Sequence, residues 1–103
     1  LATDAIDYDE AAVNKHLAPA GMRDHLTALR EALASLAAFD AASIEPAVRA
    51  LAEARGVNAG TLIHATRVSV TGRTVSPGIF EVLELLGRER ALTRLDRAIA
   101  MAG

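Results

Sequence analysis

The sequence predicts a single all-α domain, a helical bundle of about six helices. Alanine and leucine dominate the apolar residues, which make up 51% of the chain, whereas aromatic residues make up 3%. This composition favours closely packed helices. Apolar side chains also recur three and four residues apart along most of the chain. At 103 residues, the chain is long enough to bury one core. We therefore treat 1–103 as one domain, and its start at Leu1 instead of Met favours a fragment of a longer chain.

The first helix is expected over about residues 9–17. Asp9 and Glu10 place acidic side chains at its start, where the helix dipole favours them. Val13 and Leu17 lie four residues apart and therefore share one face.

Two further helices are expected in the first half of the chain. One covers about residues 20–38, because its apolar side chains are separated by 4, 3, 4 and 3 positions: Met22, Leu26, Leu29, Leu33 and Leu36. The other is predicted to be capped by Ser43, to contain Pro46 in its first turn and to end at Gly56.

The segment 60–72 has the features of both a strand and a helix. Thr66, Val68 and Val70 alternate with polar residues, which is typical of a strand. Leu62 and Thr66 are also neighbours on a helix. A lone strand would have no partner elsewhere in this chain and could not satisfy its backbone groups. We therefore expect a helix here, against local propensity.

A loop over 73–78 is expected to separate this segment from two final helices. Ser76 followed by Pro77 is a typical helix start. Gly87 is expected to end that helix, and the last one is expected to run to about Met101. Their apolar faces consist of Ile79, Val82, Leu83 and Leu86, and of Leu92, Leu95 and Ile99.

Charge is distributed unevenly between the two halves of the chain. Residues 1–48 contain three basic and eight acidic side chains, whereas 49–103 contain eight arginines, no lysine and five acidic side chains. Arginine offers a planar fork of donors that suits phosphates and base edges. A solvated helical surface of mixed charge is the other interpretation. The formal net charge of −2 speaks against generic nucleic-acid binding.

The residue types and spacings predict no active site. The chain has no cysteine and three histidines, His16, His25 and His64, none of them three or four residues from another. No metalloprotease, phosphate-loop or dinucleotide-binding motif is present. No apolar run approaches the length of a membrane span. We therefore expect no catalytic residue, no metal, no cofactor and no membrane contact for this chain.

The segment from Arg67 to Phe80 is the strongest candidate for binding. Its loop carries hydroxyl groups and leads into a helix start, whose unpaired N–H groups suit an RNA phosphate or a base carbonyl. Proteins read RNA sequence mainly in single-stranded loops, where the bases can be splayed out. A plain turn between two helices, capped by Ser76 and Pro77, is the alternative.

The same segment resembles the C-terminal end of bacterial glutamyl-tRNA synthetases, which are class I aminoacyl-tRNA synthetases. The match covers 56–100 in specific detail and 1–45 only in helix periodicity. Where that family commonly has Pro-Leu, this chain has Ala65-Thr66. The residues in register are Arg67, Thr71-Gly72, Pro77-Gly78, Leu86-Gly87, Glu89 and Arg94-Leu95.

The resemblance implies the all-helical anticodon-binding domain of such an enzyme. By this resemblance the anticodon loop of tRNA(Glu) would be approached by five residues: Arg67, Thr74, Ser76, Pro77 and Ile79. Arg67 would stack on or hydrogen-bond a base, Ser76 would supply a hydroxyl, and Pro77 with Ile79 would offer an apolar surface.

The resemblance also implies a longer parent chain, a monomeric cytoplasmic ligase. Its catalytic domain would use ATP and Mg²⁺ to charge tRNA(Glu), and in related enzymes also tRNA(Gln). Because the family's catalytic signatures are not in these residues, the fragment alone is expected to have no enzymatic activity.

Two alternative functions stay open from the sequence. The acidic first half and the alanine-rich faces suit a helical protein–protein interaction module. The region 79–101 can also be interpreted as a DNA-binding helix-turn-helix. Its arginines, however, are interleaved with Glu89 and Asp96 and give no clean basic face.

Overall fold

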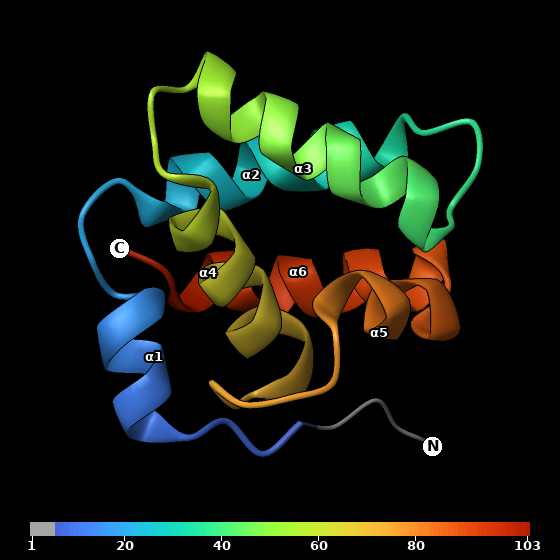
Figure 1. Cartoon of the computed structure of the whole chain (residues 1–103). Coiled ribbons are helices and arrows are strands. Elements are labelled where there is room, and N and C mark those ends of the chain that lie inside the picture. Colours follow the sequence, from blue (N-terminus) through green and yellow to red (C-terminus); the bar gives the residue numbers. More distant parts are fainter. Residues whose placement is uncertain (1–5) are drawn as a thin grey trace.

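The computed structural model describes residues 6–103, and the described chain is all-α. Six helices and no strand occur within these residues (Figure 1). The helices are α1 (Glu10–His16), α2 (Met22–Ala34), α3 (Ala41–Ala54), α4 (Ala59–Thr71), α5 (Ile79–Leu86) and α6 (Arg88–Met101). The predicted fold class is confirmed.

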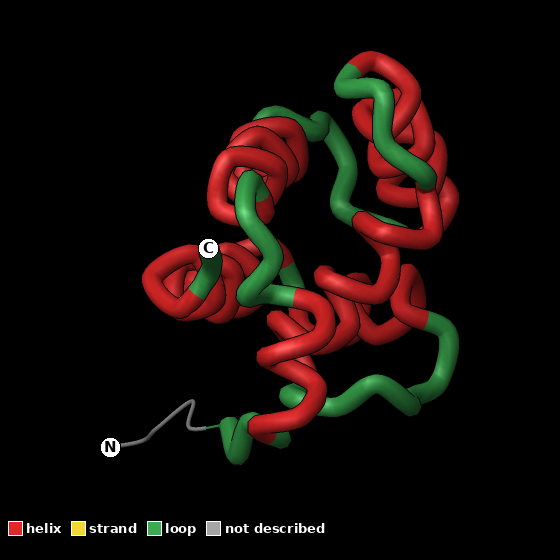
Figure 2. Tube along the Cα trace, turned by 90° about the vertical axis from the view of Figure 1, so that its left-hand side faces the viewer, coloured by secondary structure: helices red, strands yellow, loops and turns green. Residues whose placement is uncertain are grey.

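Helix α4 lies at the centre of the packing. It contacts α1, α2, α3, α5 and α6, while α2 and α6 form the most extensive helix–helix contact. Figure 2 shows α2 and α6 on one side of α4, and α3 with the loop that follows α4 on the other. The core therefore surrounds α4, with six of its residues buried: Leu62, Ala65, Thr66, Val68, Ser69 and Val70.

The ambiguous segment is helical because its polar groups are satisfied within the helix. The buried hydroxyls of Thr66 and Ser69 each donate to the carbonyl four residues earlier, at 2.7 Å in both cases. Its β-branched residues fill the core on several sides. Packing thus overrides the strand propensity of this sequence, as expected from the lack of a partner strand.

The C-terminal end of α4 is tied to distant parts of the chain. The last carbonyls of a helix have no partner within it. Here the Tyr8 hydroxyl donates to the Ser69 carbonyl at 2.8 Å, and Arg94 Nη1 donates to the Val70 carbonyl at 2.7 Å. Gly72 then closes the helix and accepts a hydrogen bond from Asp9 N at 2.9 Å.

Several predicted helix boundaries are corrected by the structure. Helix α2 ends at Ala34 rather than near residue 38, because the following turn carries Phe39 back against the core. Helix α3 is capped by Asp40, whose carboxylate accepts from the Ser43 N–H at 2.8 Å, so Ser43 is not the cap. Hydrogen bonds from the Ser43 side chain and backbone lower the pKa of Asp40.

The position of Pro46 and the buried face of the last helix also differ from the prediction. Pro46 lies in the second turn of α3 rather than the first, on an exposed face where the carbonyl that lacks its N–H partner can be solvated. Helix α6 ends at Met101 as predicted, but its fully buried residues are Ala91, Leu95 and Ala98. Leu92 and Ile99 pack at the edge of the core.

We expect Gly72→Ala to destabilise the fold more than Gly56→Ala does. Both glycines have positive φ, +79° and +70°, where a side chain costs about 1–2 kcal/mol. A Cβ at Gly72 would also lie 2.7 Å from the Asp7 carbonyl oxygen, whereas a Cβ at Gly56 meets nothing within 4 Å. Thermal unfolding followed by circular dichroism measures the difference. Equal melting temperatures of the two variants would show that the short distance between a Cβ at position 72 and the Asp7 carbonyl oxygen does not affect stability.

Candidate functional site

Arg67 projects from the second half of α4 and is half-buried. Its Nε donates to Ser76 Oγ at 2.9 Å, and its Nη1 lies 3.5 Å from His64 Nδ1. No carboxylate within residues 6–103 forms an ion pair with it. Since guanidinium carries five N–H donors, most of its hydrogen-bonding capacity is available to an external acceptor.

Arg67 forms no ion pair with an acidic residue across the bundle within residues 6–103. Glu84 Oε1 instead accepts a hydrogen bond from the Ala41 N–H at 2.8 Å, at the start of α3. The Glu81 carboxylate lies beside Gly78, so that a Cβ on that glycine would overlap it. Neither of these carboxylates forms an ion pair with Arg67.

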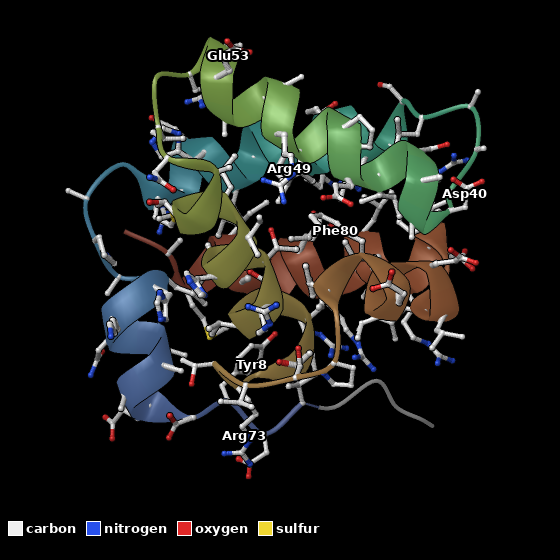
Figure 3. All side chains as sticks on the ribbon, in the orientation of Figure 1. Tyr8, Asp40, Arg49, Glu53, Arg73 and Phe80 are labelled. Carbon is white, nitrogen blue, oxygen red and sulfur yellow. The ribbon has the colours of Figure 1, made fainter. Side chains whose placement is uncertain are left out.

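The loop 72–78 is held at its beginning by its own side chains. Thr71 Oγ1 accepts from the Arg73 N–H at 3.1 Å, and Arg73 Nη2 lies 3.4 Å from Asp7 Oδ2. Figure 3 shows Arg73 in the same region as Tyr8, where the N-terminal segment passes this loop. Thr74, Val75 and Pro77 are exposed, and they present hydroxyl and apolar groups to solvent.

Ser76 joins the loop to α4 rather than capping α5. Its hydroxyl accepts from Arg67 Nε and donates to the Pro77 carbonyl at 2.9 Å. The cap of α5 is Gly78, which offers no side-chain hydrogen bond. The predicted cap at Ser76 with Pro77 in the first helical position is therefore wrong, because the guanidinium holds the hydroxyl away from the helix start.

Ile79 lies in the core and is 2% exposed. The expectation that its side chain offers an apolar surface to a base is therefore incorrect: it anchors the end of the loop against the other helices. Val75 is the exposed apolar group instead, with 83% of its side chain accessible. An apolar residue amid polar loop residues was the signal that could have identified it.

His64 is a second residue that the sequence did not assign to the site. It lies three residues before Arg67 and on the same side of α4, because residues three apart are neighbours on a helix. Its other neighbour is His16 of α1, whose ring centroid is 5.3 Å from that of His64. The helical spacing to Arg67 could have revealed one contact, whereas the contact with His16 depends on the fold.

The start of α5 is less suited to a phosphate than the sequence predicted. The carboxylate of Glu81 folds back toward Gly78, the residue that precedes the first turn of α5. A carboxylate in this position repels phosphate but can accept a hydrogen bond from the exocyclic amine of a base.

Two arginines of α6, Arg88 and Arg94, stabilise the fold. Arg88 donates to the Leu36 carbonyl and stacks over the ring of Phe39, with 5.5 Å from its Cζ to the ring centroid. Arg94 caps α4 as described above. A single residue, Gly87, joins α5 to α6, whereas a helix-turn-helix has a turn of about three or four residues. The DNA-binding interpretation is therefore not supported.

Neither a metal site nor a membrane span is found in the described part of the chain. No three acidic or histidine side chains within residues 6–103 are grouped so that they could hold a metal ion. None of the helices there combines the length and the apolar character needed to cross a membrane.

Comparison with known proteins gives one consistent relationship. A family model described as an anticodon binding domain matches residues 1–99. The chain is 48% identical over 96 residues to a glutamate–tRNA ligase of Moorella thermoacetica, covering 93% of this chain and 20% of that protein. It is 46% identical over 99 residues to the corresponding ligase of Desulforudis audaxviator, covering 94% of this chain and 20% of the relative.

A solved structure supports the same relationship at the level of the fold. The crystal structure of a glutamate tRNA ligase from Elizabethkingia meningosepticum, in complex with its amino acid, matches with a TM-score of 0.86 and 30% identity. The match covers 94% of this chain and 19% of that one. The chain thus spans about a fifth of the length of these relatives.

We expect Ser76→Ala to loosen the loop while leaving the bundle intact. Loss of the hydroxyl removes the hydrogen bond from Arg67, which costs about 0.5–1.5 kcal/mol. Hydrogen exchange of the backbone amides in 73–76 should therefore accelerate. Thr74→Ala, which removes an exposed hydroxyl from the same loop, is the matched control. Unchanged exchange in Ser76→Ala would mean that the bond to Arg67 does not order the loop.

Proposed function

Since the chain belongs to the family of anticodon-binding domains, we propose that it holds the anticodon loop of tRNA(Glu) for a glutamate–tRNA ligase. The ligase reaction would take place in a catalytic domain of the same parent chain. ATP and Mg²⁺ would act in that domain, because these 103 residues contain no nucleotide-binding motif. For the parent we expect a cytoplasmic monomer.

The observation that carries the proposal is the unpaired charge of Arg67 at the edge of a loop. Its guanidinium is oriented by Ser76 and has no carboxylate partner within residues 6–103. A planar fork of donors in a fixed position can bind two acceptor atoms of one base edge, or a phosphate. This is the chemistry required to read an unpaired base.

The surrounding groups fit a splayed single strand. Thr74 can donate or accept a hydrogen bond, and Pro77 is exposed for packing against a base. Glu81 can accept from an exocyclic amine, which would complement donation by Arg67. The binding site of the proposal therefore consists of Arg67, Thr74, Ser76 and Pro77, with Glu81 added and Ile79 as the buried anchor beneath them.

The exposed surface explains why few phosphates are expected to take part. The chain has a formal net charge of −2, and the guanidinium groups of Arg88 and Arg94 already donate to backbone carbonyls. Binding energy would then come mainly from base contacts, so the affinity for tRNA should fall only gradually with salt.

We expect Arg67→Ala to weaken binding of a tRNA(Glu) anticodon hairpin by roughly five- to 150-fold, which corresponds to about 1–3 kcal/mol for a lost bidentate contact to a base. Filter binding of the 103-residue chain measures it, with an anticodon-altered hairpin and duplex DNA as competitors. Arg67→Lys keeps the charge but loses the fork, so it should recover little discrimination.

The control for this prediction is Arg90→Ala, which removes one exposed positive charge from α6. It should leave both affinity and discrimination unchanged. An Arg67→Ala variant that melts several degrees lower yet still distinguishes anticodons would overturn the proposal, because Arg67 would then stabilise the fold instead of reading RNA.

A further inference from the structure

A pocket of about 420 Å³ lies between the end of α1 and the first half of α4. Figure 1 shows α1 beside α4, and the segment that follows α1 leads into α2. This volume is within the range of small-ligand sites. The lining residues are Lys15, His16, Pro19, Met22, Asn58, Gly60, Thr61 and His64.

The polar lining of this pocket is basic. Lys15 and His16 come from the last turn of α1, and His64 comes from α4. The two imidazole rings are 5.3 Å apart between centroids and inclined by 31°. The lining contains no aspartate or glutamate. Three nitrogen-bearing side chains without a carboxylate favour an anionic ligand.

The surroundings of His16 disfavour its protonated form. Burial is the main cause that lowers the pKa of His16, and the neighbouring charges of His64 and Lys15 lower it further. From α2 the pocket receives Met22, and from the connecting segment Pro19, so neither element adds a charge. A bound anion would favour the protonated imidazole.

The pocket is continuous with the proposed base-reading site. His64 lines the pocket and also places its Nδ1 3.5 Å from Arg67 Nη1. The exposed hydroxyl of Thr61 and the Asn58 side chain complete the polar lining at the start of α4. One RNA strand could therefore reach both places, with bases at Arg67 and backbone at the pocket.

We propose that this pocket binds a backbone phosphate, with its ribose, of the RNA whose bases contact the Arg67 loop. The inference rests on the proposed function and extends it with a second contact for the same ligand. Lys15 supplies the fixed positive charge, while His16 and His64 supply N–H donors. RNA binding should therefore tighten as the pH falls, because a bound phosphate favours the protonated form of His16, whose pKa burial lowers.

The test measures fluorescence anisotropy of a labelled tRNA(Glu) anticodon hairpin with the 103-residue chain, over a salt series and at about pH 7.5 and about pH 5.5. Lys15→Ala should weaken binding severalfold and reduce the slope of log K against log salt concentration by about 0.7. Lys15 is exposed, so this variant should fold normally. The double variant His16→Gln, His64→Gln should lose the gain in affinity at low pH.

Arg90→Ala is the matched control, because it also removes one positive charge but lies on α6, on the other side of α4 from the loop (Figure 2). A slope reduced equally by Arg90→Ala would overturn the inference in favour of a net-charge effect. Wild-type binding by the Lys15 and histidine variants, with loss in Arg67→Ala, would overturn the pocket alone. Wild-type binding by Arg67→Ala as well would overturn the proposed function.

Discussion

The need to satisfy the last carbonyls of α4 organises this molecule. Because α4 is surrounded by other helices, water cannot serve all of these groups, and an unpaired buried carbonyl is costly. The partners come from opposite ends of the chain: the Tyr8 hydroxyl for Ser69 and the Arg94 guanidinium for Val70. The Gly72 carbonyl also accepts a hydrogen bond from Asp9 N. The C-terminal end of α4 therefore holds the N-terminal segment and α6 together.

This arrangement also fixes the starting point of the candidate site. Arg67 lies about one turn before the tied end of α4, and the loop that it holds through Ser76 begins directly after that end. The donor Arg67 and the acceptor Ser76 thus both lie close in sequence to the end of α4, which is held by distant residues. A binding group that is already positioned loses less conformational entropy when its ligand arrives.

The distribution of charge in the sequence indicated a basic second half. It could not show which of its arginines stabilise the fold and which are available to a ligand. Arg94 binds a carbonyl at the end of α4, Arg88 binds the Leu36 carbonyl in the loop after α2, and Arg23 from the acidic half binds the Ala102 carbonyl at 2.9 Å. Arg67 differs because it donates to the hydroxyl of Ser76 and forms no ion pair with a carboxylate of residues 6–103. Whether an arginine stabilises the fold or stays available to a ligand depends on which backbone carbonyls lie near its guanidinium group. The packing of segments that are distant in the sequence decides which carbonyls these are.

By itself, the sequence determined the fold class, the number and order of the helices and the core face of α2, since these depend on apolar spacing and chain length. Only the tertiary structure decided the rest, as three features illustrate. Gly78 rather than Ser76 caps α5 because Arg67 takes the hydroxyl, Ile79 turns into the core, and His16 meets His64. Local sequence encodes periodicity, whereas competition between side chains far apart in the chain arises only when the helices pack.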